Sequence, residues 1–295
     1  MQMKIDVQRL GDGPIIRPHM DRRMGDNVNG PSLIRVPEWL PNALGRYYLY
    51  FGHHDGHYIR LAVADDLTGP WRTHKAGVLP LDESLFAGHI ASPDVIVDDE
   101  AKRIHLYYHG ADVPTGEQAP QFTRVAVSED GLQFSAQPEI LGRPYMRVIR
   151  CQSWTYAIAM PGQFYRSRDG LTGFEEGPNP FAANMRHAAL QILGDQLRVF
   201  YSRIGDAPER ILLSTIDLAT DWRDWQPTSP IEVLAPERAY EGGDLPLRPS
   251  VRGLAVEPVR ELRDPAVFEE NGEAYLLYSV AGESGIAIAR LCVSP

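Results

Sequence analysis

The chain has little of what marks several large classes of protein. Its 295 residues include two cysteines, Cys151 and Cys292, too few for a disulfide framework, and we expect both to be buried thiols. No run of lysine or arginine exceeds two residues and the formal net charge is −10, which argues against a nucleic-acid partner. No apolar run approaches the roughly 18 residues of a transmembrane helix, and the N-terminus lacks a signal-peptide pattern. We therefore expect a cytoplasmic protein without a membrane partner, and the sequence leaves its oligomeric state open.

Glycine and proline are frequent, with 26 and 24 residues, as in chains of many short elements joined by turns. A short aromatic-rich run with the composition of a β-strand recurs five times, at 47–51, 104–108, 156–159, 197–201 and 274–278. A second run precedes each copy, at 32–36, 94–97, 147–150, 188–193 and 266–269. A third run follows each copy, at 58–64, 122–127, 164–167, 211–215 and 285–291. After the third run, four copies have an acidic turn, and an aromatic residue then opens a fourth strand at Trp71, Phe134, Phe174 and either Trp222 or Trp225.

This repeat predicts an all-β fold, a five-bladed β-propeller of four-stranded antiparallel blades that forms one domain over residues 1–295. The fifth copy is one strand short, while the N-terminal run Met3–Val7 has strand character and no blade of its own. We expect this run to pair into the last blade and close the ring. A two-sheet sandwich with repeated hairpins is the alternative. A loop rich in proline and charge, at about 227–262, is expected to lie across one face and cap it.

Two sets of loops in such a propeller emerge on the same face: those that lead into each innermost strand and those that join the second and third strands. They hold six of the nine histidines, a clustering of groups that titrate near neutrality and that therefore marks a candidate site. The first set supplies Asp26, His89, Asp94, Tyr145, Arg147, Arg186, His187, Arg263 and Asp264. The second set supplies His54, Asp55, His109, Asp206 and Glu283. Carboxylates, arginines, histidines and aromatic rings together suit a small polyhydroxylated ligand, a carbohydrate.

The segment His53-His54-Asp55-Gly56-His57 has residue types that bind divalent metals, but no zinc-motif spacing. We expect no required cofactor. A single divalent cation on the propeller axis, held in part by His54, His89 or His109, is kept as an alternative.

Two segments resemble the five-bladed glycoside hydrolases of family 43: the stretch 60–71, Arg60 through Trp71, and Ala91-Ser92-Pro93-Asp94-Val95. The tripeptide Arg263-Asp264-Pro265 is similar to a motif of related furanosidase families, and family 117 shares the architecture. The resemblance implies an inverting glycosidase with three acidic residues, one from each of the first three blades. On this resemblance Asp94 matches the second-blade aspartate, which orients the general acid and raises its pKa.

The chain departs from that pattern in the first and third blades. Asn29-Gly30 stands where the first-blade aspartate is usual, so the resemblance leaves Asp26 or Asp55 as general base. The third blade opens with Arg143–Arg147 and has no glutamate, which leaves three alternatives for the acid. These alternatives are His187, a residue type thought to serve as the acid in family 117, Asp264 and, on the long loop, Glu241.

We expect an exo-acting glycoside hydrolase that releases a sugar from a small oligosaccharide or glycoside. Two alternatives stay open: a non-catalytic carbohydrate-binding propeller, and a glycoside phosphorylase or transglycosidase in which arginine and histidine hold phosphate. The remaining candidates, His54, His89, His109, Tyr145, Arg147, Arg186, Arg263, Asp206 and Glu283, are expected to bind substrate.

Overall fold

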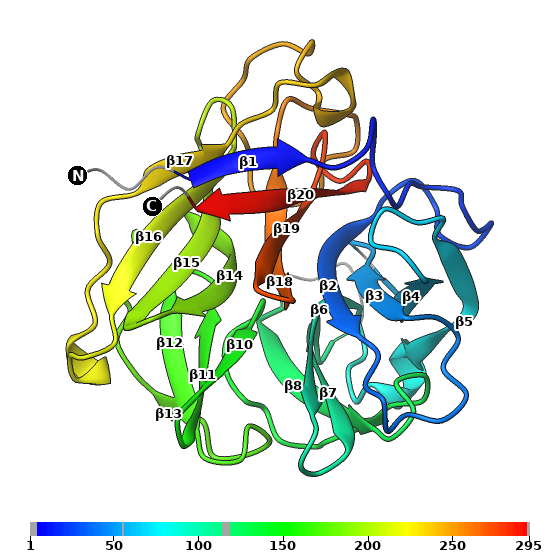
Figure 1. Ribbon diagram of the computed structural model, residues 1–295, viewed down its shortest axis with the longest axis vertical. Helices are drawn as coiled ribbons and strands as arrows, with labels where there is room; N and C mark the ends of the chain where they lie inside the picture. Colours follow the sequence, from blue (N-terminus) through cyan, green and yellow to red (C-terminus); the bar gives the residue numbers. More distant parts are fainter. Residues whose placement is uncertain (1–4, 55, 114–118, 294–295) are drawn as a thin grey trace.

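The computed structural model describes residues 5–54, 56–113 and 119–293. Five four-stranded antiparallel sheets stand around a central axis, as Figure 1 shows in a view close to that axis. This arrangement confirms the predicted five-bladed propeller. No helix in the described part of the chain has the length and apolar composition needed to cross a membrane.

Each blade runs outward from its innermost strand. Blade 1 contains β2 (Asn29–Arg35), β3 (Tyr47–Gly52), β4 (Tyr58–Ala64) and β5 (Arg72–Pro80), followed by the 3-10 turn η1 (Leu81–Glu83). Blade 2 contains β6 (Ile90–Asp98), β7 (Arg103–Ala111), β8 (Gln121–Ser128) and β9 (Ser135–Ala136). Blade 3 contains β10 (Arg147–Cys151), β11 (Trp154–Ala159), β12 (Gln163–Ser167) and β13 (Glu175–Glu176). Blade 4 contains β14 (Met185–Leu193), β15 (Gln196–Arg203), β16 (Ile211–Asp217) and β17 (Ile231–Leu234), and blade 5 contains β18 (Arg263–Glu270), β19 (Glu273–Ser279) and β20 (Ile286–Val293).

The N-terminal strand closes the ring. Strand β1 (Ile5–Arg9) pairs antiparallel with β20, from Ile5 opposite Val293 to Arg9 opposite Ala289. In Figure 1 the blue β1 lies beside the red β20. This pairing confirms the predicted closure, and it makes the last blade four-stranded by joining the two ends of the chain.

The blades pack against one another through buried aromatic side chains. Tyr50 and Tyr107 occupy the second strands of blades 1 and 2, and both are fully buried. The Tyr50 hydroxyl donates a hydrogen bond to the Gly131 carbonyl (2.9 Å), and the Tyr107 hydroxyl donates to the Gly170 carbonyl (2.7 Å). Both glycines lie in the acidic turn of the next blade and have a positive φ, which glycine adopts at low cost. The repeated turn therefore presents a carbonyl that ties one blade to the next.

Blade 4 differs from the sequence prediction at its outer edge. Trp222 lies in the 3-10 turn η2 (Trp222–Asp224), and the fourth strand is β17, so the prediction that Trp222 or Trp225 opens that strand is wrong. Asp221 caps the turn by accepting a hydrogen bond from the Arg223 backbone N–H, and both tryptophans pack against Tyr156. The long loop consequently occupies residues 235–262, after β17, and contains the 3-10 turn η3 (Ala239–Glu241).

Buried histidines make the fold sensitive to acid. His105 in β7 is 2% exposed, and burial lowers its pKa to about 4. In the unfolded chain its pKa is about 6.5, so unfolding takes up a proton between these values, and stability falls as the pH falls from 6.5 to 4. We expect this residue to contribute on the order of 2 kcal/mol to that loss. Urea unfolding at pH 7 and pH 4.5 should therefore show a smaller pH effect in His105→Gln than in the wild type. An equal effect in both proteins would contradict the assignment.

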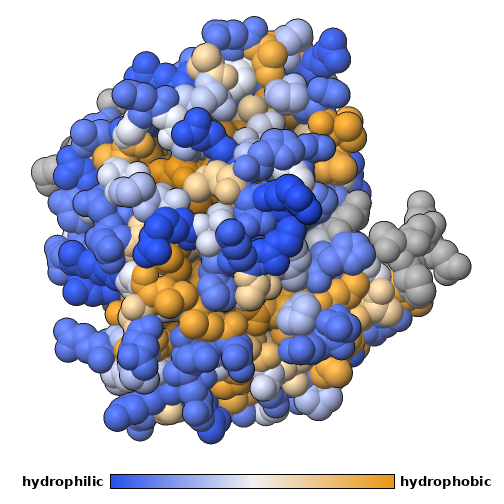
Figure 2. All heavy atoms as spheres, turned by 90° about the vertical axis from the view of Figure 1, so that its right-hand side faces the viewer, coloured by the Kyte–Doolittle hydropathy of each residue, from blue (hydrophilic) through white to orange (hydrophobic). Residues whose placement is uncertain are grey.

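Figure 2 shows the side of the molecule that is on the right in Figure 1, where hydrophobic residues are interspersed with hydrophilic ones. The exposed large hydrophobic side chains include Met20 and Leu85, and three of them, Leu247, Val251 and Val256, lie in the long loop.

Candidate functional site

A residue with left-handed backbone geometry occurs at the same place at the start of each blade. These residues are Gly30, Ser92, Tyr145, His187 and Asp264, with φ of 57°, 45°, 61°, 37° and 48°. In four blades the pairing of the first two strands shifts register around this residue. Positive φ is uncommon for residues other than glycine, and such strain is concentrated at functional sites. These five left-handed residues determine which side chains meet where the axis opens on this face and which lie below that opening.

Two residues further along each chain segment, the side chains border a small cavity on the axis. Ser32, Asp94, Arg147, Ala189 and Ala266 contribute to the lining of this cavity of about 90 Å³. Asp94 accepts a hydrogen bond from the Val148 backbone N–H (2.7 Å) and pairs with Arg147 (3.3 Å). Burial raises the pKa of Asp94, and the Arg147 charge opposes that shift. Asp94 and Arg147 thus join neighbouring blades below the mouth of the axis.

A larger pocket, of about 270 Å³, opens on the face that the two loop sets share. Its polar lining consists of His54, Gln121, Tyr145, Arg186, His187 and Arg252. Tyr145 and His187 are left-handed residues of the ring, and Arg252 comes from the long loop. The structure therefore brings together here four of the predicted site residues, His54, Tyr145, Arg186 and His187. No aspartate or glutamate lines this pocket among the residues that the structure describes.

His187 forms a buried pair with an aspartate. Its Nδ1 atom lies 2.6 Å from Oδ1 of Asp264, whose other oxygen accepts a hydrogen bond from the Ser279 hydroxyl (2.9 Å). Burial lowers the pKa of His187 to about 4, so the imidazole is neutral at pH 7. Burial alone would raise the pKa of Asp264, but His187, Arg186 and Ser279 together hold it below its usual value. With its Nδ1 edge toward a carboxylate, the ring has Nε2 left as a proton acceptor.

His54 forms a second pair of the same kind. Its Nδ1 atom lies 3.3 Å from Oε1 of Glu283, and the Asn29 amide donates to the other carboxylate oxygen (3.0 Å). Burial alone would raise the pKa of Glu283, but His54 and Asn27 bring it below its ordinary value, so Glu283 is ionised at neutral pH. Two imidazoles, each backed by an ionised carboxylate, therefore line one pocket.

Aromatic and imidazole rings continue from the pocket toward blade 2. The ring centroids of His187 and Tyr145 are 4.7 Å apart, those of Tyr145 and His109 are 4.0 Å apart, and those of His109 and His89 are 5.9 Å apart. Burial lowers the pKa of His109 well below its usual value, and the neighbouring histidines add to the shift. Among the described residues, no three His, Cys, Asp or Glu side chains gather in a way that could hold a metal ion. The single cation kept as an alternative, held in part by His54, His89 or His109, is therefore not supported by such a group in the described part of the chain.

Arg263 is the centre of the ion-pair network beneath the pocket. It is 1% exposed and its guanidinium contacts Glu261 (2.5 Å), Glu283 (3.1 Å) and Glu209 (3.7 Å). Burial alone would lower the pKa of Arg263, but the carboxylates outweigh burial and raise it, so the charge is permanent. Arg263 consequently positions Glu283, the partner of His54, and is not itself exposed to a ligand.

Four of the remaining candidates lie away from the pocket or outside the described residues. The Asp26 side chain is 90% exposed and pairs with His19 (2.9 Å). Glu241 is fully buried and bonds to Arg9 (2.7 Å), which ties the long loop to β1, and Asp206 pairs with Arg203 (3.1 Å). Asp55 lies outside the residues that the structure describes.

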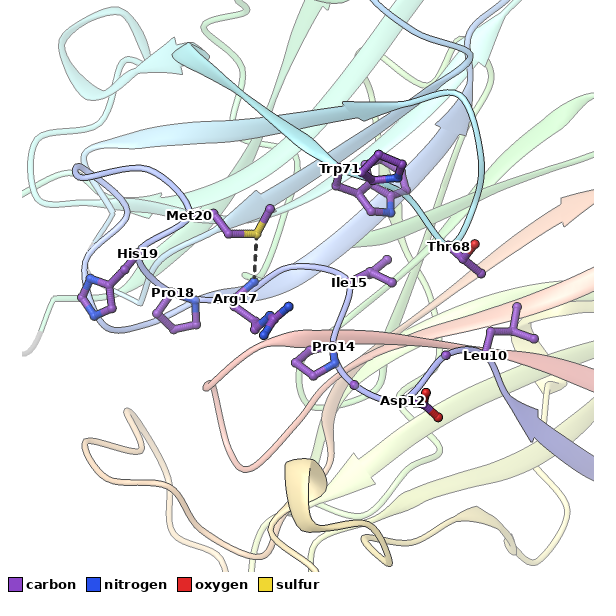
Figure 3. Close-up of a pocket in the computed structure, with 13 residues that line it drawn as sticks. Leu10, Asp12, Pro14, Ile15, Arg17, Pro18, His19, Met20, Thr68 and Trp71 are labelled. Atoms are coloured by element: carbon purple, nitrogen blue, oxygen red, sulfur yellow. Dashed lines mark hydrogen bonds between the residues drawn. The ribbon is translucent and has the colours of Figure 1, made fainter.

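A more open hollow of about 760 Å³ lies at the rim of the propeller, between residues 10–20 and the turn before β5 (Figure 3). Its charged residues, Asp12, Arg17 and His19, all come from one loop, and His19 is paired outside the hollow with Asp26. Trp71, at the back of the hollow, is buried against the core of blades 1 and 5. This hollow has no paired acid and base in its lining, so the pocket of about 270 Å³ that His54 and His187 line is the candidate site.

Comparison with solved structures identifies the class of fold. The chain is similar to a family 43 β-xylosidase/α-arabinofuranosidase from a compost microbial metagenome, solved with xylotriose, with 14% identity, a TM-score of 0.64, and coverage of 97% of this chain and 94% of that chain. It is equally similar to an α-L-arabinofuranosidase of Podospora anserina solved with cellotriose, with 14% identity, a TM-score of 0.64, and 97% of each chain covered. The protein therefore has the five-bladed propeller fold of these glycoside hydrolases.

The sequence itself matches no family model. It is 38% identical over 299 aligned residues to an uncharacterized protein of Acanthamoeba polyphaga mimivirus, with 90% of this chain and 83% of that protein covered. The chain belongs to the same family as this viral protein.

Proposed function

We propose that the protein is an exo-acting, inverting glycoside hydrolase in which two histidine–carboxylate pairs perform the acid–base chemistry. The observation that carries the proposal is that His187, paired with Asp264, and His54, paired with Glu283, line one pocket. The fold shared with glycoside hydrolases supports the substrate class.

The reaction has one displacement. His187 Nε2 takes a proton from a water molecule, whose oxygen attacks the anomeric carbon while the glycosidic C–O bond breaks. His54 in its protonated form gives a proton to the leaving oxygen, and the negative charge of Glu283 stabilises that form of the ring. Inversion is supported because no described carboxylate lines the pocket to act as a nucleophile and form a covalent glycosyl intermediate.

Exo action is supported by the size of the pocket. Its volume of about 270 Å³ lies just below the range of ~300–1,000 Å³ for drug-sized ligands, so it suits one sugar ring. The long loop contributes Arg252 and Gly253 to its wall, which closes one side.

A panel of aryl α- and β-glycosides and plant and algal oligosaccharides tests the proposal. We expect the wild type to hydrolyse at least one substrate with inversion at the anomeric carbon, and turnover to be independent of phosphate and of chelator. His187→Gln should lose this turnover, because the neutral amide cannot accept the water proton. Asp94→Asn is the matched variant outside the pocket, and it should retain turnover. Loss in Asp94→Asn with full activity in His187→Gln would reverse the assignment of roles.

One observation favours a second candidate, a non-catalytic sugar-binding propeller. Two carboxyl groups facing the sugar are the usual requirement for glycoside hydrolysis, and here the described carboxylates lie behind histidines. Sugar binding measured by calorimetry, with no turnover over days, would establish this candidate. A phosphorylase is less well supported, because Arg263, the arginine at the entry of blade 5, is engaged by three glutamates.

A further inference from the structure

Hydrogen-bond donors dominate the polar lining of the pocket. Arg186 and Arg252 have donors only, and Gln121, Tyr145 and the two histidines have both donors and acceptors. A neutral sugar presents hydroxyl groups, which need acceptors as well as donors, and carboxylates are the usual acceptors. The described carboxylates nearest the pocket, Asp264 and Glu283, are already bonded to histidine, serine, asparagine and arginine. The lining therefore matches a ligand that is rich in acceptors.

Arg186 has donor capacity that the described protein does not use. It is 3% exposed, and its NH1 nitrogen donates to the Val251 carbonyl (3.1 Å) and to Glu209 (3.4 Å). Its Nε atom is buried and has no hydrogen-bond partner among the described atoms. Arg186 also lines the pocket, so part of its guanidinium faces the space that a ligand would occupy, and an anionic group bound there would pair with its positive charge.

Arg252 brings a second positive charge to the same place. It follows Val251, whose carbonyl accepts the hydrogen bond from Arg186, so the two arginines lie on neighbouring segments of the wall. Arg252 is exposed and makes no ion pair with a carboxylate in the part of the chain that the structure describes. One buried and one exposed guanidinium can hold the two oxygens of an acid group from different sides.

We propose that the pocket selects a sugar that bears an acid group, a carboxylate or a phosphate, and that Arg186 and Arg252 bind this group. The inference deepens the proposed function and depends on it for the sugar. The acid group confers specificity, while the histidine pairs act on the glycosidic bond.

Calorimetry on the whole protein tests the inference with matched ligands. The probes are D-glucuronate against D-glucose, D-galacturonate against D-galactose, glucose 6-phosphate against glucose, and inorganic phosphate alone. We expect at least one acidic sugar to bind about tenfold or more tightly than its neutral counterpart, equivalent to about 1.4 kcal/mol. The uronates and the phosphate ester separate the two sources of the charge.

Variants of the two arginines locate the preference. Arg252→Gln and Arg186→Lys should each reduce the ratio of acidic to neutral affinity at least threefold, whereas Arg248→Gln, an exposed arginine of the same loop outside the pocket, should keep it. Arg186→Lys keeps the charge that pairs with Glu209, so it tests the guanidinium geometry without leaving a buried carboxylate unpaired.

Three results would overturn the inference: equal affinity for every acidic sugar and its neutral counterpart, an unchanged ratio in both arginine variants, or inorganic phosphate binding as tightly as the sugar phosphate. Failure of the proposed function is a separate result. If no glycoside is hydrolysed but the acidic preference exists and needs Arg252, the site is an acidic-sugar binding site without catalysis. If neutral glycosides are hydrolysed without such a preference, the hydrolase stands and this inference fails.

Discussion

Replacement of Asp264 by asparagine is expected to lower the rate of glycoside hydrolysis by about 10²–10⁴-fold, while sugar binding is largely retained. The aspartate lies 2.6 Å from His187 Nδ1, and its negative charge favours the tautomer with the ring proton on that nitrogen. An asparagine amide can donate to Nδ1 instead, which moves the ring proton to Nε2 and removes the proton acceptor. The measurement is kcat and KM on a substrate that the wild type cleaves.

Asp206→Asn is the matched control for this variant. Asp206 lies in a loop of the same face, pairs with Arg203 and does not line the pocket. We expect the control to keep wild-type kcat, and both variants to keep the fold as judged by the unfolding midpoint. For the wild type, kcat/KM should fall as the pH falls through about 4, where His187 takes up a proton. A kcat for Asp264→Asn within threefold of the wild type would exclude the His187–Asp264 pair as the base.

The fold was predictable because a short sequence pattern repeats five times along the chain, once for each blade. Each blade follows from short strands and turn residues that lie next to one another in the chain. The N-terminal strand was assigned to the last blade because the fifth repeat is one strand short. The exception was the outer strand of blade 4. Trp222 lies in a capped 3-10 turn and Trp225 directly follows that turn. Aromatic composition alone cannot distinguish a strand from a turn packed against the same core.

The sequence predicted which face of the propeller holds the site, but not which residues meet there. Loop position brought His54, Tyr145, Arg186 and His187 into the candidate set, and the structure gathers them in one pocket. The bulge that shifts the register in four of the five innermost strands could not be read from the sequence. Because of it, Asp94 lies two residues beyond Ser92, the left-handed position, and its side chain enters the lower cavity.

Contacts between distant residues account for the rest of the site. The two histidine–carboxylate pairs join positions 77 and 229 residues apart, and no sequence spacing indicates such pairs. Arg252 and Gln121 were not among the predicted site residues. A signal existed for Arg252, since the long loop was expected to cap this face. Charged residues of that loop were therefore candidates, although the sequence does not say which of them reaches the pocket.

Replacement of Arg263 by methionine is expected to cost about 3–5 kcal/mol of folding free energy at pH 7, because it leaves buried carboxylates without their counter-charge. Arg263 is 1% exposed and contacts Glu209, Glu261 and Glu283. Arg290→Met is the control: Arg290 pairs with Glu273 at a similar distance, 3.2 Å, but the pair is solvent-exposed, so its loss should change the folding free energy far less than the loss of Arg263.

The pH dependence distinguishes loss of charge pairing from loss of packing. Without Arg263 the folded-state pKa values of the buried glutamates rise above their unfolded value of about 4.3. The folded variant then binds more protons than its unfolded chain, so its stability relative to the wild type improves as the pH is lowered from 7 to 5. Urea unfolding of wild type, Arg263→Met and Arg290→Met at both pH values measures the difference. If the loss of unfolding free energy in Arg263→Met is equal at pH 7 and pH 5, the Arg263 side chain acts by filling space. Another positive group would then have to keep Glu283 ionised beside His54.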